Sequence, residues 1–268
     1  MVKEDDHRFF LTTFDAYDDT ICMGTTDGKI YLHSISKGLY LYKRFEIARG
    51  GDGQIVNCLK FLDREQLLTA TNDCTVKVWD LEHMKPKLNF DFKDPINVAA
   101  ISPDGNILGV YGDCLQAEIL DLRTGEVITT LHGHTDFGFS LCWHPDGNIL
   151  ATGNQDLTCK IWDVRYLNQN HSSAYCIKTL ECAIGASADV KFAGRGGSQL
   201  VFSETIDFLQ IWDTATFSKC QKIDLFGYIS GFDTFDDKLF LGIRDGNGQF
   251  SCLMEYEEDR SCDSDSLR

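Results

Sequence analysis

Four side chains in one stretch of the sequence carry the functional groups of a hydrolase active site. His134, Thr152, Asp156 and Trp162 supply an imidazole, a hydroxyl, a carboxylate and an indole N–H. A hydroxyl activated by an imidazole, which a carboxylate orients, is the arrangement of nucleophilic hydrolases. Such a nucleophile must be exposed and must face an oxyanion hole, and no motif for that hole accompanies these residues. The sequence therefore favours a structural role over catalysis.

Other catalytic or ligand-binding motifs are weak or missing. His132 and His134 lie two residues apart, but no cysteine or carboxylate follows at ligand spacing, so no zinc site is predicted. The sequence contains no phosphate-binding G-x-x-x-x-G-K-[ST] motif. The glycine-rich stretch 194–197 lies between two expected strands and is typical of a hairpin turn. We predict no enzyme activity, no cofactor and no metal.

The stretch that holds the four residues, Leu131–Arg165, recurs along the chain. Its Trp162-Asp163 end matches Trp79-Asp80, Leu120-Asp121 and Trp212-Asp213, at intervals of about 40 to 50 residues. The first unit matches the others less well and has His33 at the tryptophan position. A degraded last copy follows in residues 241–256, so the sequence contains six units.

Each unit has the pattern of short β-strands. Residues 53–61, 65–71 and 75–81 are apolar runs rich in β-branched and aromatic side chains. Ser-Pro-Asp-Gly at 102–105 and His-Pro-Asp-Gly at 144–147 are type I turn sequences. No helical periodicity of useful length occurs. The chain is therefore predicted to be all-β.

The period, the Gly133-His134 opening and the Trp-Asp ending resemble the WD40 repeat, which forms four-stranded propeller blades. The sequences of the fourth and fifth units are similar to those of an uncharacterised subfamily of eukaryotic WD-repeat proteins. The resemblance implies an all-β, WD40-type β-propeller with six recognisable blades, or seven if one is highly irregular. Blade centres are expected near residues 22, 67, 108, 150, 201 and 241.

The resemblance also gives domain boundaries. Residues 9–256 form the expected propeller, and residues 1–8 are a short N-terminal segment that could serve as the closing strand of the last blade. With so short a segment we expect poor closure of the propeller ring, a three-stranded blade where the first and last blades meet, or ring closure assisted by a partner. Residues 166–175 form a polar insertion, and the acidic tail 257–268 is predicted to be disordered.

In WD40 blades the four residues of the fourth unit resemble a structural hydrogen-bond chain. The resemblance implies that the indole of Trp162 donates to Thr152, Thr152 to His134, and His134 to Asp156, so each buried polar group is satisfied. Two other units keep parts of this chain without the histidine. These parts are Thr69, Asp73 and Trp79 in the second unit, and Ser203, Asp207 and Trp212 in the fifth.

Family geometry also implies where partners bind. One face of the ring gathers the loops that lead into the blades and the turns that carry the aspartates. Candidate contacts there are Asp136, Phe137, Asn72, Gln155 and Ile206. A rigid aromatic on a loop is a typical interface anchor, although Phe137 could instead pack between blades.

Residues 149–165 resemble the box by which WD40 substrate receptors dock on the adaptor of cullin-4 ubiquitin ligases. Arg165 is the discriminating position, because an exposed arginine can bind a carboxylate with two hydrogen bonds. The primary expectation is a non-catalytic protein-interaction scaffold with protein partners of unknown identity. The alternative is a substrate receptor whose partner is the cullin-ligase adaptor.

Charge and cysteine content bound the remaining function classes. With 25 basic and 41 acidic residues the net charge is −16, so direct nucleic-acid binding is not expected, whereas a basic protein partner is tolerated. No apolar run is long enough for a membrane span. The polar N-terminus does not resemble a signal peptide. Eleven cysteines without framework spacing are typical of a reducing compartment, so we expect an intracellular protein, cytoplasmic or nuclear or both.

Overall fold

Short strands follow one another through the chain. The computed structural model describes residues 10–38, 40–47, 54–165, 174–235, 238–245 and 251–257. Within these ranges the β-branched and aromatic runs form strands β1 to β23, and the sole helical element is the 3₁₀ turn η1 (Arg195–Gly197) between β17 and β18. No helix of the described residues has the length and hydropathy that a membrane crossing requires.

The strands form six antiparallel sheets, which we number as blades in chain order. Blade 1 contains β1 (Leu11–Tyr17), β2 (Thr20–Thr25), β3 (Lys29–Ser34) and β4 (Tyr40–Glu46). Blade 2 contains β5 (Val56–Phe61), β6 (Gln66–Thr71), β7 (Thr75–Asp80) and β8 (Lys85–Asp91). Blade 3 contains β9 (Ile96–Ile101), β10 (Ile107–Gly112), β11 (Ala117–Asp121) and β12 (Val127–Leu131).

The remaining blades continue the series. Blade 4 contains β13 (Gly138–Trp143), β14 (Ile149–Asn154), β15 (Thr158–Asp163) and β16 (Tyr175–Glu181). Blade 5 contains β17 (Ser187–Ala193), β18 (Gln199–Glu204), β19 (Phe208–Asp213) and β20 (Cys220–Asp224). Blade 6 has three strands among the described residues, β21 (Tyr228–Phe235), β22 (Lys238–Arg244) and β23 (Ser251–Glu257).

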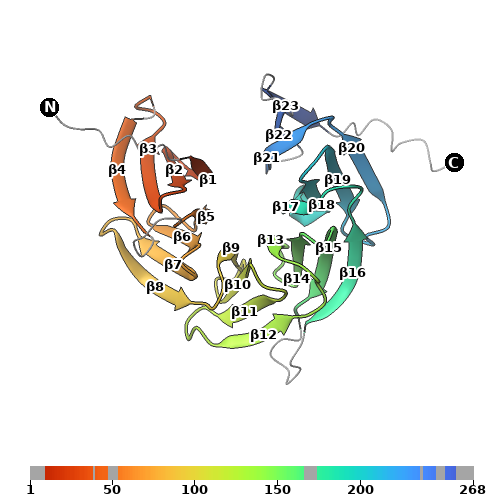
Figure 1. Cartoon of the computed structure of the whole chain (residues 1–268), viewed down its shortest axis with the longest axis horizontal. Helices are drawn as coiled ribbons and strands as arrows, with labels where there is room; N and C mark the ends of the chain where they lie inside the picture. The colour runs from red at the N-terminus through yellow and green to blue at the C-terminus, as the bar shows by residue number, and fades with distance from the viewer. Residues whose placement is uncertain are drawn as a thin grey trace.

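The six blades are arranged radially around a central axis, with the first strand of each blade innermost (Figure 1). Adjacent blades touch through these inner strands, from β1 against β5 through to β17 against β21. No comparable contact joins the described parts of blades 6 and 1. The ring is therefore open between them, as Figure 1 shows.

The hydrophobic core lies between blades. Each of the five apolar clusters combines side chains of two neighbouring blades. In β6, β10, β14 and β18, every residue after the first is buried, because both sides of the strand face another blade. In β22 buried and half-buried residues alternate, which is the period of a strand covered on one side.

The faces toward the opening keep an apolar character. Phe14 of β1 pairs with Met23, on the opposite side of the sheet from the core residue Cys22, and 75% of Phe14 is exposed. On blade 6, Leu253 pairs with Gly242, on the opposite side from the buried Leu241, and 78% of Leu253 is exposed. Both end blades thus present uncovered apolar side chains to the opening.

The predicted fold class is confirmed: the chain is an all-β, six-bladed propeller. Each predicted blade centre lies in the second strand of its blade, from residue 22 in β2 to residue 241 in β22. The expected segment 1–8 lies outside the described residues. So do the tail after Glu257 and the polar insertion, apart from Ala174 and Tyr175.

Candidate functional site

The four residues of blade 4 form one continuous hydrogen-bond chain. The indole Nε1 of Trp162 donates to Thr152 Oγ1 at 2.8 Å, and Thr152 Oγ1 lies 2.9 Å from His134 Nε2. His134 Nδ1 lies 2.8 Å from Asp156 Oδ2. Since an indole can only donate, the threonine hydroxyl donates to Nε2, and the proton on Nδ1 is directed at the carboxylate. Thr152 lies on β14 and Trp162 on β15, and Asp156 lies in the turn between these two strands.

The hydrogen-bond chain of blade 4 is buried in the core. Thr152 is 0%, Trp162 1% and His134 6% exposed, so no substrate can reach the hydroxyl. Asp156 also accepts hydrogen bonds from Thr158 Oγ1 at 2.6 Å and from the backbone N–H of Thr135 at 3.0 Å. The carboxylate therefore ties the lead-in loop of blade 4 to the turn between β14 and β15.

Protonation of this pair is set by its surroundings. Burial lowers the pKa of His134 below 6.5, although the hydrogen bond to Asp156 acts in the opposite direction. Burial alone would raise the pKa of Asp156, but the hydrogen bonds from Thr158 and His134 outweigh it and lower that pKa below 3.8. At neutral pH the geometry corresponds to a neutral imidazole bonded to an ionised carboxylate.

This protonation predicts a loss of stability in mild acid. Because the pKa of His134 is lower in the folded state, the unfolded chain binds the proton first, so the free energy of unfolding should fall as pH drops below about 6.5. The lowered pKa of Asp156 adds a further loss at lower pH. Urea unfolding at several pH values should show a shallower slope for His134→Gln than for wild type. Identical slopes would contradict the assignment.

Blade 2 keeps the first link of the chain and rearranges the rest. The Trp79 indole donates to Thr69 Oγ1 at 2.9 Å. Asp73 does not reach Thr69, because blade 2 has no histidine to span the distance; it accepts instead from Thr71 and Thr75. Its carboxylate also pairs with Lys77 Nζ at 3.6 Å. Among the described residues, the expected fragment Thr69, Asp73 and Trp79 thus divides into two clusters.

Blade 5 differs from its predicted network. The Trp212 indole donates to Gln210 Oε1 at 3.1 Å and not to Ser203. Asp207 has a left-handed backbone with φ 59°, whereas in blades 2 and 4 the residue after the aspartate, Cys74 or Leu157, takes that conformation. The turns of blades 4 and 5 have the same register, so Asp207 occupies the position of Leu157 and Ile206 that of Asp156. The predicted trio of Ser203, Asp207 and Trp212 is wrong as a connected network.

In blade 5 the buried hydrogen-bond acceptor is a glutamate. Glu204 is 0% exposed, and its carboxylate accepts from three consecutive backbone N–H groups, those of Ala183, Ile184 and Gly185, at 2.8, 2.9 and 2.9 Å. Gln210 Nε2 donates to the same carboxylate at 2.7 Å. Sequence reasoning missed Glu204, although an acid two residues after the apolar run 200–202, within the same expected strand, is a signal for such a site.

The lead-in loops and the turns between second and third strands meet at one end of the ring. Backbone hydrogen bonds join them, as from Gln155 N to Phe137 O and from Thr205 N to Ala186 O, both at 2.9 Å. We call this end the loop face. Its exposed large apolar residues come from blades 3 to 6 and their connections: Leu115, Phe137, Leu157, Ile184, Ile206 and Phe226.

Most of the candidate contact residues lie on the loop face. Phe137 is 43% and Ile206 38% exposed, and Gln155 is exposed beside them. Asp136 is half-buried, and its carboxylate accepts from the N–H of Phe137 at 2.9 Å. Asn72 is half-buried and accepts from Asn57 at 2.6 Å, which gives it a structural role.

Arg165 lies apart from the other candidates. It follows β15, whereas Gln155 and Asp156 precede that strand, so Arg165 belongs to the opposite end of blade 4. Its guanidinium forms two hydrogen bonds from Nε and Nη2 to the carboxylate of Asp163 in its own turn. The structure therefore separates the loop-face candidates from the arginine.

Metal-binding geometry does not occur in the part of the chain that the structure describes. No group of three or more His, Cys, Asp or Glu side chains there could hold a metal ion. His132 is exposed, and its Nε2 lies 2.7 Å from the hydroxyl of Thr130.

Comparisons with known proteins agree with this architecture. The family model of the WD domain, G-beta repeat, matches residues 45–80 and 125–163. These ranges include β5 to β7, and β13 to β15 with the hydrogen-bond chain of blade 4.

Curated relatives match over larger parts of the chain. A periodic tryptophan protein 2 homolog of Dictyostelium discoideum is 24% identical over 89% of this chain and 25% of its own length. A DENN domain and WD repeat-containing protein SCD1 of Arabidopsis thaliana is 32% identical over 55% of the chain and 12% of its own length. Eukaryotic translation initiation factor 3 subunit I of Drosophila willistoni is 29% identical over 52% of the chain and 47% of its own length.

The chain spans half or less of the length of these relatives. What they share with it is the repeat, and three observations agree on that repeat: the matched ranges, the spacing of the Trp-Asp landmarks and the radial sheets. The chain carries WD40 repeats and has the fold of a WD40-type β-propeller.

Proposed function

We propose that the protein is a non-catalytic interaction platform that binds a protein partner through its loop face. The observation that carries this proposal is the row of exposed apolar side chains from consecutive blades. Phe137, Leu157, Ile184 and Ile206 are 43%, 48%, 55% and 38% exposed on loops and turns of one end. Apolar residues gathered on one face of a soluble protein mark an interaction surface. The blades beneath them supply the rigid support.

Charge on the same face suggests the chemistry of the partner. Asp94 and Asp113 are exposed at the lead-in loop and turn of blade 3, and Asp136 lies beside Phe137. In a chain of net charge −16 these carboxylates favour a partner that combines apolar contacts with lysine or arginine. The same charge disfavours a phosphate backbone.

The absence of catalysis rests on how the reactive groups are used. The hydroxyl of Thr152 is buried and bonded to Trp162 and His134, so it cannot attack a substrate. A location inside the cell is supported by the ten described cysteines, all of which are free thiols. The name of one relative, eukaryotic translation initiation factor 3 subunit I, fits a part in a larger protein assembly.

A comparison of variants in cells tests the loop face. Tagged wild type and the double variant Phe137→Ser/Ile206→Ser should fold alike, since both side chains are partly exposed. We expect the double variant to lose most of the proteins that co-purify with wild type, as judged by quantitative mass spectrometry. Retention of the same proteins would refute the proposed face.

Arg165→Ala is the matched control at the opposite end of blade 4. The loop-face proposal expects this variant to keep the wild-type partners. Selective loss of a cullin-ligase adaptor from Arg165→Ala, with an unchanged melting temperature, would instead support the substrate-receptor alternative. The pairing of Arg165 with Asp163 means that docking through Arg165 would have to break these hydrogen bonds.

A further inference from the structure

Among the described residues, blade 6 lacks the outer strand that the other blades have. In blades 1 to 5 the third strand pairs with a fourth, whereas β23 pairs only with β22 among the described residues. In the part of the chain that the structure describes, the outer edge of β23 therefore has no strand partner, and such an edge is a template for another strand. This edge is on the far side of blade 6 from the central axis (Figure 1).

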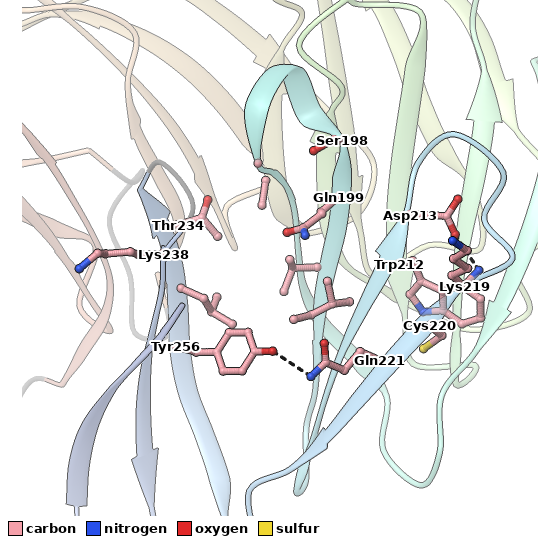
Figure 2. A pocket seen from close by; sticks show the side chains of 15 residues that line it. Ser198, Gln199, Trp212, Asp213, Lys219, Cys220, Gln221, Thr234, Lys238 and Tyr256 are labelled. Atoms are coloured by element: carbon pink, nitrogen blue, oxygen red, sulfur yellow. Dashed lines mark hydrogen bonds between the residues drawn. The ribbon is translucent and has the colours of Figure 1, made fainter. Parts of the chain in front are cut away.

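A pocket of about 470 Å³ adjoins this edge, between blades 5 and 6. Tyr256 of β23 and Gln221 of β20 lie on opposite sides of it, and the amide Nε2 of Gln221 donates to the tyrosine hydroxyl at 2.9 Å (Figure 2). Ser198 and Thr234 line the end of the pocket that is farther from the loop face, near the turns β17–β18 and β21–β22.

The other blade boundaries show what fills the corresponding place. After the third strand of blades 2 to 5 the chain turns, and an apolar residue of that turn packs into the cluster shared with the preceding blade. These residues are Leu81, Leu122, Val164 and Phe217. In blade 2 the contact is direct, because Lys43 of the preceding blade donates from Nζ to Leu81 O at 2.7 Å. After β23 the sequence continues instead with Glu258 and Asp259.

We propose that the pocket and the free edge of β23 form one docking site for an extended segment of another polypeptide. This segment adds a fourth strand to blade 6 and places an apolar side chain in the pocket. Strand addition supplies main-chain hydrogen bonds, and the pocket supplies side-chain specificity. The site lies at the opposite end from the loop face, so it goes beyond the proposed function and does not depend on it.

The other outer strands give the chemistry of this segment. Each places an apolar side chain under the next blade: Phe45, Phe90, Leu131, Leu180 and Ile223 are examples. Four of the five outer strands, all but β12, also carry lysine. The occupant is therefore a strand in which apolar residues and lysines alternate, preceded by an apolar anchor. The exposed Leu253 offers an apolar contact on the side toward the opening.

A synthetic peptide taken from the chain itself tests the site. The sequence of residues 81–91, LEHMKPKLNFD, contains the anchor and outer strand of blade 2. Fluorescence anisotropy of the labelled peptide with the whole protein should show saturable binding below about 1 mM. Replacing the peptide's first leucine with aspartate should weaken binding about tenfold or more, because the apolar anchor is lost.

Two protein variants locate the binding. Thr234→Trp fills the pocket and should weaken binding about tenfold, whereas Thr179→Trp, on the exposed outer strand of blade 4, should leave it unchanged. Hydrogen exchange at β23 should slow when the peptide is bound. Absence of saturable binding, equal affinity of both peptides, or unchanged exchange at β23 would overturn the proposal. The two peptides decide the matter on wild-type protein even if Thr234→Trp fails to fold.

Discussion

Replacing Asp156 with alanine should lower the free energy of unfolding by about 3 kcal/mol. The carboxylate is the common acceptor for His134 Nδ1, Thr158 Oγ1 and the backbone N–H of Thr135. Its removal leaves these donors unpaired in a site where His134 is 6% exposed. The loss should lower the melting temperature by roughly 5–10 °C. Urea unfolding monitored by tryptophan fluorescence measures the effect.

The same blade contains a matched control. His144 Nδ1 and Asp146 Oδ1 lie 2.8 Å apart, as close as the buried pair, but the Asp146 side chain is 48% exposed. Because water replaces a lost surface partner, Asp146→Ala should cost less than about 1 kcal/mol. If the two alanine variants unfold at the same urea concentration, burial of the His134–Asp156 pair is not what makes it stabilising.

Much of the fold could be predicted because it depends on repetition. Turn residues and apolar runs recur with one period, and together with the resemblance to the WD40 repeat this period gave six blades and the position of each second strand. The Gly-His and Trp-Asp landmarks likewise pointed to the hydrogen-bonded residues of blade 4, and the structure places them within hydrogen-bonding distance. Here residue type and period together determine geometry.

Blade 5 shows where this reasoning fails. Ser203 and Asp207 lie one residue nearer to Trp212 than Thr152 and Asp156 lie to Trp162, so in the strand register they match Gly153 and Leu157. Asp207 accordingly has the left-handed backbone of Leu157. A shift of one residue along a strand turns a side chain to the other face of the sheet, and counting back from the tryptophan reveals this shift. The buried side-chain hydrogen bonds of blade 5 are formed instead by Glu204 and Gln210, which alignment to the repeat does not single out.

The opening of the ring was only partly foreseeable. A three-stranded last blade was among the expectations, and blade 6 has that form in the described residues. The apolar face that Phe14 presents to the opening was not predicted, because whether a strand is covered on one side or both depends on its neighbours in space. Alternation along a single strand does not supply that information.

Replacing Glu204 with alanine should have the largest effect, about 3–5 kcal/mol in the free energy of unfolding. The carboxylate is fully buried and satisfies the N–H groups of Ala183, Ile184 and Gly185 together with the amide of Gln210. Successive N–H groups that converge on one anion form a strong site without a cation. Their loss removes what holds the loop between blades 4 and 5.

Glu204→Gln separates charge from shape. An amide has the size of the carboxylate, but its NH₂ would face backbone N–H donors, so we expect a loss between that of alanine and wild type. Hydrogen exchange at residues 183–185 should quicken in both variants, and the fluorescence signal of Trp212 should change because its acceptor, Gln210, must reorient.

Glu255→Ala, which removes an exposed carboxylate paired with Lys238, is the control and should cost less than about 1 kcal/mol. Since Ile184 belongs to the loop face, loosening of this loop should also weaken partner binding there. Wild-type stability in Glu204→Ala would show that the loop is held by packing and not by the buried charge.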